Sequence, residues 1–186
     1  MEYRIKEFFD RRSFLKLGTF VTGMLISHGP VFAKIRPFTS ERTLSFYNSH
    51  TGESLRTVYW FKGEYLGTAL ADINYILRDH YSGEVSPIDT RLLDLHYILH
   101  RKLEARHPFH VISGYRSPRT NALLSSTGHG VATNSLHISG KALDVRLQGF
   151  ELSSVRKAAI QLREGGVGYY PKSNFIHLDV GSVRYW

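Results

Sequence analysis

Ser135-Leu136-His137-Ile138-Ser139-Gly140-Lys141-Ala142-Leu143-Asp144 is the stretch from which the fold and the chemistry of this chain are best argued. It runs from a polar segment into the strand-like sequence Leu143–Leu147. We therefore expect His137 to come from a loop and Asp144 from a strand. The small residues between them, Gly140 and Ala142, let the backbone pass close to a bound ion.

A second histidine, His177, lies 33 residues after Asp144 in the apolar run Phe175–Val180, which predicts a last strand. Two neutral imidazoles and one carboxylate leave a fourth position for water, which is the ligand set of catalytic zinc. Such an ion lowers the pKa of its water to about 7 and polarises a carbonyl. The chain has 10 histidines, so spacing alone leaves hydrogen-bonded or exposed histidines as the alternative.

The remaining sequence predicts an α+β fold. Two β-rich runs around a glycine-containing turn, 44–48 and 55–60, predict a hairpin. Apolar spacing from Gly67 favours a helix. A second helix presents one apolar face, made of Ile88, Leu92, Leu95, Ile98, Leu99 and Leu103.

The second half adds strands at 109–113 and 143–147, a short helix ending near Leu124, a loop over 128–134, a helix over 152–163 and an edge strand near 183–186. Strands and helices alternate without a repeated βαβ period. We predict a single domain over residues 34–186, with a small, mostly antiparallel sheet flanked by helices.

His96 and His100 are four residues apart on the second predicted helix, a spacing at which two imidazoles can share a metal. The helix is otherwise an ordinary amphipathic one, and no carboxylate accompanies the pair. We interpret these histidines as structural.

The N-terminal segment resembles a twin-arginine export signal. Arg11-Arg12 precede Phe14-Leu15-Lys16, a weakly apolar run follows over 17–26, and Val31-Phe32-Ala33 fits a signal-peptidase site. We predict a signal peptide over residues 1–33, cleaved after Ala33, and a periplasmic product without stable membrane insertion. The apolar run is shorter than the ~20 residues of a membrane span; an uncleaved anchor is the alternative.

Composition narrows the function further. The formal net charge of the full chain is +8. The predicted signal holds five basic and three acidic residues, so its removal leaves 19 basic and 13 acidic residues and a net charge of +6. A mildly basic surface suits an anionic polymer such as peptidoglycan, whereas the absence of a Lys/Arg-rich run argues against nucleic acid. The chain has no cysteine, which excludes thiolate ligands and fits a protein that folds before export.

Three segments resemble the signature blocks of the LAS metallopeptidases: Ser113-Gly114-Tyr115-Arg116-Ser117, Ser135-x-His137-x-x-Gly140-x-Ala142-x-Asp144 and Phe175-Ile176-His177-Leu178-Asp179. Within that group the chain is most similar to the MepK-type murein endopeptidases, which share the hairpin sequence Tyr47–Glu53 and the approach Gly165–Pro171. The resemblance runs from Leu44 to Trp186 and implies a Hedgehog/D,D-peptidase-like fold.

The resemblance implies a Zn²⁺ ion on His137, Asp144 and His177, with Arg116 holding a substrate carboxylate or the developing oxyanion. It implies a peptidoglycan endopeptidase that hydrolyses cross-link peptides at bonds to meso-diaminopimelate. The alternatives are a D,D-carboxypeptidase and a catalytically inactive murein-binding protein. We expect a monomer.

The general base is where the chain departs from many relatives, which place a glutamate three residues or a histidine two residues before the last zinc ligand. Those positions are Asn174 and Phe175 here. Asp179 lies on the same strand face as His177, so it is either the base or a group that orients His177. His129 is the other candidate base.

Overall fold

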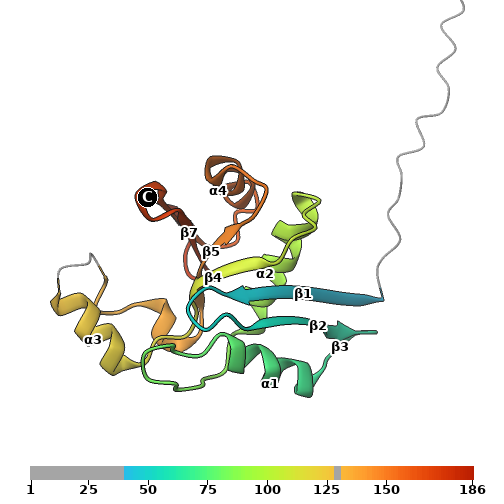
Figure 1. Cartoon of the computed structure of the whole chain (residues 1–186). Helices are drawn as coiled ribbons and strands as arrows, with labels where there is room; N and C mark the ends of the chain where they lie inside the picture. The colour runs from blue at the N-terminus through green and yellow to red at the C-terminus, as the bar shows by residue number, and fades with distance from the viewer. Residues whose placement is uncertain (1–39, 128–130) are drawn as a thin grey trace, which may run out of the picture. The chain divides into compact units, whose positions relative to one another are not determined.

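The computed structural model describes residues 40–127 and 131–186. This part of the chain forms one eight-stranded mixed sheet in the order β3-β2-β1-β4-β5-β7-β6-β8 (Figure 1). Adjacent strands are antiparallel except in the β1–β4 and β6–β8 pairs. The predicted single α+β domain with a mostly antiparallel sheet is confirmed, although the sheet has more strands than expected. The predicted signal, 1–33, and His129 lie outside the described residues.

The strands and helices follow the predicted order. The strands are β1 (Glu41–Asn48), β2 (Ser54–Phe61), β3 (Glu64–Tyr65), β4 (Phe109–Ser113), β5 (Ala142–Leu147), β6 (Gly166–Tyr170), β7 (Phe175–Asp179) and β8 (Arg184–Tyr185). The helices are α1 (Gly67–Ile76), α2 (Thr90–Lys102), α3 (Pro118–Ser126) and α4 (Leu152–Ile160), with 3₁₀ turns η1 (Leu136–Ser139) and η2 (Pro171–Ser173).

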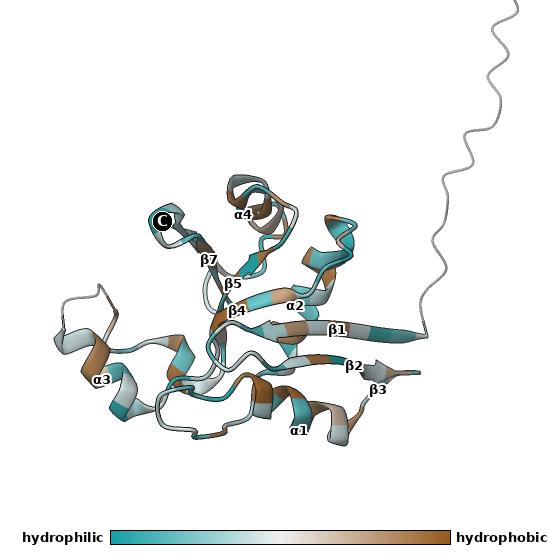
Figure 2. Ribbon diagram, viewed as in Figure 1, coloured by the Kyte–Doolittle hydropathy of each residue, from teal (hydrophilic) through white to brown (hydrophobic). Residues whose placement is uncertain are grey.

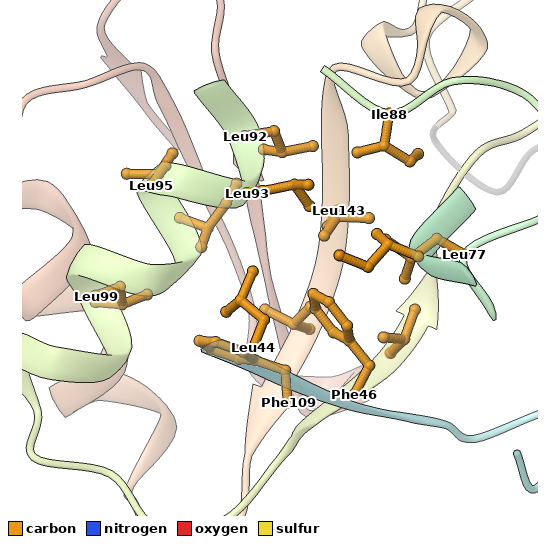
Figure 3. Packing of buried hydrophobic residues seen from close by; sticks show 14 of the residues in the cluster. Leu44, Phe46, Leu77, Ile88, Leu92, Leu93, Leu95, Leu99, Phe109 and Leu143 are labelled. Carbon is orange, nitrogen blue, oxygen red and sulfur yellow. The ribbon is translucent and has the colours of Figure 1, made fainter. Parts of the chain in front are cut away.

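The predicted hairpin is β1–β2, and it joins the rest of the sheet through parallel pairing of β1 with β4, with Phe46 beside Phe109. Leucines from α2 pack against the apolar side chains of these central strands (Figure 3). Hydrophobic stretches lie on β4 and β7 (Figure 2). The apolar face of α2 differs from the prediction at one position: Ile98 is 45% exposed, whereas His96 is fully buried.

The glycine-rich approach Gly165–Pro171 contains strand β6, which pairs with β7 and places Gly168 opposite His177. A Cβ at Gly168 would stand 2.7 Å from the indole of Trp186, and one at Gly165 would collide with the carbonyl of Asp179. A side chain at Gly165 would push the start of β6 away from β7, and one at Gly168 would displace the indole of Trp186. Within residues 40–127 and 131–186, we find no helix with the length and apolar character of a bilayer span.

Candidate metal centre

The register of the sheet sets four residues in one row across β4, β5, β7 and β6. Ser113 is opposite Asp144, Asp144 is opposite His177, and His177 is opposite Gly168. Directly opposed residues of antiparallel strands share a face. The row therefore brings Asp144 and His177, 33 residues apart in sequence, into contact on one face of the sheet.

The third member of the cluster, His137, comes from η1 rather than from an irregular loop. Ser135 caps this turn by accepting a hydrogen bond from the His137 amide (3.4 Å). Gly140 ends it with φ +64°, a conformation natural to glycine, and a Cβ there would collide with the carbonyl of Pro87. This tight fit fixes the position of His137 relative to β5.

Three side-chain atoms converge at this point. His137 Nε2 lies 3.2 Å from His177 Nδ1, which lies 2.8 Å from Asp144 Oδ1; the third side of the triangle, His137 Nε2 to Asp144 Oδ1, is 3.3 Å. All three residues are buried, with exposures of 9% or less. Ligand atoms about 2.0–2.2 Å from a tetrahedral ion lie about 3.3 Å from each other. The spacing of the three atoms therefore suits one small cation.

Hydrogen bonds to the outer ring nitrogens fix the tautomers of both histidines. His137 Nδ1 lies 2.7 Å from the Gly114 carbonyl oxygen, which accepts only, so Nδ1 carries the proton. His177 Nε2 donates to Asp179 Oδ2 at 3.0 Å. In the neutral rings the lone pairs of His137 Nε2 and His177 Nδ1 then face each other and Asp144. Three acceptors this close need a proton or a metal ion between them.

The electrostatics of the cluster point the same way. Burial alone would lower the pKa of His177, but hydrogen bonds to Asp144 and Asp179 raise it to about 9. Burial alone would raise the pKa of Asp144, but the imidazoles of His137 and His177 hold it below its ordinary value. The site thus attracts positive charge, and a bound metal would displace the proton from His177.

Asp179 is fully buried behind His177. Its Oδ1 accepts from the amides of Gly166 (3.1 Å) and Gly181 (2.8 Å), and its Oδ2 accepts from Arg184 at 2.7 Å as well as from His177. These bonds overcome the cost of burial and lower the pKa of Asp179 to about 2. Both oxygens are occupied, so the carboxylate is placed to orient the His177 ring.

Arg116 lies beside Asp144 at the mouth of the cluster, with Nη2 3.7 Å from Asp144 Oδ2. Its backbone amide donates to the His137 carbonyl (3.2 Å), which ties the segment after β4 to η1. The guanidinium also makes long bonds to Ser113 Oγ (3.2 Å) and Asn121 Oδ1 (3.3 Å). These weak contacts hold Arg116 in place and leave donors for an anionic group.

The cluster opens into a cleft with two lobes that share Arg116, Asp144 and Phe175. The larger lobe, about 510 Å³, is lined also by Tyr170, Arg184 and Trp186. The smaller lobe, about 230 Å³, is lined also by His50, Asp79 and His80. Space for a ligand therefore extends on two sides of Asp144.

An aromatic wall in the larger lobe was not predicted from the sequence. Tyr170 stacks on Phe175 with 4.6 Å between ring centroids, Trp186 Nε1 donates to the Tyr170 hydroxyl at 2.8 Å, and the indole lies 5.3 Å from the His177 ring. The only signal was the density of aromatic residues in the last 18 positions of the chain. Position 175, where some relatives carry a base, thus contributes to this wall.

An α+β domain in which a buried His-Asp-His cluster lines an open cleft has the architecture of a peptidase. The family model described as "Peptidoglycan L,D-endopeptidase MepK" matches residues 36–186, and the chain belongs to this family.

Two relatives identified by sequence agree with the family match. The chain is 42% identical over 180 residues to the peptidoglycan L,D-endopeptidase MepK of Escherichia coli (strain K12), covering 95% of this chain and 97% of that protein. It is 39% identical over 178 residues to a probable peptidoglycan L,D-endopeptidase MepK of Haemophilus influenzae, covering 95% of each. The Serratia marcescens L-Ala D-Glu endopeptidase ChiX has a TM-score of 0.35 and 19% identity over 52% of this chain and 69% of its own.

The structure thus brings together five of the six residues singled out from the sequence. His137, Asp144 and His177 form the cluster, Asp179 binds His177 from behind, and Arg116 lies at the mouth. His129 belongs to the segment 128–130, outside the described residues. The roles of all six stay predictions.

Proposed function

We propose that this chain is a zinc-dependent peptidoglycan endopeptidase that hydrolyses peptide cross-links at an L,D bond, as the names of its relatives suggest. The observation that carries the proposal is the convergence of three ligand atoms, His137 Nε2, His177 Nδ1 and Asp144 Oδ1, while the outer nitrogens of both rings are engaged by other acceptors.

Zinc is the ion that this donor set favours, because two imidazoles and one carboxylate are a common set for catalytic zinc, and no cysteine or further carboxylate joins the cluster among the described residues. When bound, it would supply a water of lowered pKa and polarise the scissile carbonyl.

The protein's own groups would do the rest. Arg116, held beside Asp144 with free donor capacity, binds the oxygen on which negative charge develops. Asp179 keeps the proton on His177 Nε2 and so keeps Nδ1 available as a ligand. Of the two roles considered for Asp179, its burial and occupied oxygens favour orientation over proton transfer.

The two-lobed cleft favours an endopeptidase over a D,D-carboxypeptidase. An endopeptidase must hold peptide on both sides of the scissile bond, and space is available in two lobes that meet at Asp144 and Arg116. A carboxypeptidase needs room for only one terminal residue on one side.

We further propose that residues 1–33 are a twin-arginine signal removed at Ala33, and that residues 34–186 act in the periplasm. The paired arginines and the Val31-Phe32-Ala33 sequence support this. N-terminal sequencing of the protein from a periplasmic fraction tests it; a periplasmic product that keeps Met1, or its absence from that fraction, contradicts it.

The activity is tested with three purified muropeptides: an L,D-linked dimer, a D,D-linked dimer and an unlinked pentapeptide. The zinc-loaded protein should release monomers from the L,D-linked dimer only. Loss of the terminal D-alanine from the pentapeptide would indicate the carboxypeptidase. Binding without any product would indicate an inactive murein-binding protein.

A further inference from the structure

The smaller lobe contains a pair of histidines that the proposed chemistry does not use. His50 and His80 stack face to face, with 3.7 Å between ring centroids and 4° between planes. His50 belongs to the hairpin sequence Tyr47–Glu53 noted above, and His80 follows α1. Neither contributes an atom to the His137-Asp144-His177 cluster.

The turn that carries His50 is fastened to the body of the protein. The buried side chain of Asn48 accepts from the amides of His50 (2.9 Å) and Thr51 (3.2 Å) and donates to the carbonyl of Ile76 (2.9 Å). His50 Nε2 donates to the Ile112 carbonyl at 3.0 Å. This carbonyl lies two residues before that of Gly114, which holds His137. One short segment of chain therefore anchors both the imidazole pair and the metal cluster.

Two aromatic rings contact His80. His50 covers one face, and Tyr81 contacts the ring with 4.3 Å between centroids. Asp79, buried next to it in sequence, accepts from the amides of Ser117 and Tyr81, each at 2.9 Å, which fixes the backbone here. The nitrogens of His80 make no hydrogen bond within residues 40–127 and 131–186. A polar ring is thus positioned in the lobe with its own donor unsatisfied.

The charges around His80 determine what it can bind. Burial, the neighbouring His50 and Arg116 lower the pKa of His80, although Asp79 opposes them, so the ring is uncharged near neutral pH. A neutral imidazole still carries one N–H donor. The carboxylate oxygens of Asp79 already accept from two backbone amides and from Thr120, so they are not free to accept from a ligand. What the lobe offers a ligand is therefore N–H donors, from His80 and from Arg116.

We propose that the smaller lobe is a carboxylate subsite. His80, held by its stack on His50, and Arg116 together bind a free carboxylate of the substrate. This carboxylate is the one on the D-configured carbon that bears the scissile nitrogen. The inference rests on the proposed function, since it assigns one side of that substrate. His80 acts here as a specificity-determining residue that contacts substrate without taking part in bond breaking.

The test uses two L,D-linked dimers that differ only in this group, one with the free carboxylate and one with a carboxamide. The wild-type protein should prefer the carboxylate by about tenfold or more in kcat/KM, mostly through KM, because hydrogen bonds to charged groups are among the stronger ones. His80→Phe keeps the aromatic stack and removes the donor, so it should reduce the preference to within about twofold. His80→Asn returns an N–H donor and should restore part of it.

His110→Phe is the matched control, because His110 is also a half-buried imidazole that packs against an aromatic ring, Tyr47, but lines neither lobe. This variant should keep the wild-type preference. Thermal melting of each variant verifies folding. The proposal is overturned if His80→Phe discriminates between the dimers as well as wild type does, or if wild type does not discriminate.

Calorimetric binding of both dimers to the metal-free protein separates this proposal from the proposed function. Preferential binding of the carboxylate form, lost in His80→Phe, supports the subsite even if neither dimer is hydrolysed. Equal binding together with equal hydrolysis rejects the subsite and leaves the endopeptidase function standing.

Discussion

This protein has two pairs of histidines, and the pair that is closer in sequence is not the one that forms the candidate metal site. His96 and His100 are four apart on α2, whereas His137 and His177 are 40 apart on η1 and β7. His96 Nδ1 bonds the Leu92 carbonyl of its own helix (2.7 Å), and His100 Nε2 bonds the His107 carbonyl (2.9 Å). In the distant pair, the outer nitrogens are engaged and the inner ones face Asp144. A structural histidine is thus distinguished from a candidate ligand by what its ring nitrogens contact, and not by sequence spacing.

The largest expected effect comes from removing the carboxylate between the distant histidines. Asp144→Ala should lose bound zinc and all measurable hydrolysis, because two imidazoles alone hold the ion weakly. Metal content by mass spectrometry and monomer release from the L,D-linked dimer measure both. Asp72→Ala, an exposed acidic position on α1, is the control and should match wild type. Full zinc occupancy in Asp144→Ala would contradict the assignment of the metal site to Asp144 and the distant histidine pair.

A smaller effect is expected behind the cluster. Asp179→Asn should weaken zinc binding by about 10- to 100-fold, the usual cost of removing a group that orients a ligating histidine. Activity should return when zinc is raised in a metal-buffered assay. If kcat instead stays low at saturating zinc, Asp179 is the general base and the orienting role is wrong.

The α2 pair should affect acid stability and leave the metal site untouched. Burial lowers the pKa of His96 to about 4 from an ordinary 6.5, so the folded state binds fewer protons than the unfolded state between those values. Stability is therefore lost as pH falls from 6.5 to 4, by up to about 3 kcal/mol from this residue. His96→Leu should remove most of that loss in chelator-treated protein.

Urea titrations at several pH values measure this difference. The same variant should keep wild-type zinc content, and near neutral pH its stability should change by about 1 kcal/mol or less, because the lost hydrogen bond is offset by removing the buried, unpartnered Nε2. A wild-type protein whose acid sensitivity equals that of His96→Leu would contradict the assignment.

The smallest effect belongs to His100. Its ring is partly exposed and bonds one backbone carbonyl, so His100→Ala should cost about 0.5–1.5 kcal/mol of stability, the net value of an ordinary hydrogen bond. Zinc content and hydrolysis should not change. A fall in either would show that the close pair does bind the metal.

Much of the fold followed from local sequence, because amphipathic helices and alternating strands bury faces that can be recognised within a few residues. The hairpin, α1, α2 and the last strands were predicted in order. The parallel pairing of β1 with β4 was not, since it depends on packing between Phe46 and Phe109, far apart in the chain. Ile98 was predicted to lie in the core because it is apolar, but the sequence does not give the exact rotation of α2 about its axis, which turns this side chain toward solvent.

For the site, the three cluster residues and Arg116 were predicted from motifs, whereas their supports were not. Arg184 behind Asp179, Trp186 beside His177 and the His50–His80 stack all depend on loops and strand edges meeting in space. No periodicity or spacing in one sequence encodes such contacts. This is why the sequence leaves two roles open for Asp179, of which the orienting one is our proposal.

The close approach of Gly165 to the carbonyl of Asp179 has a practical consequence for reading mutational data. In a saturation library, position 165 would tolerate substitution poorly, because the clash is with backbone, although this residue contributes no atom to the cluster. Ranked by fitness alone, this glycine would be mistaken for a catalytic residue; its intolerance records the space that a neighbouring strand occupies.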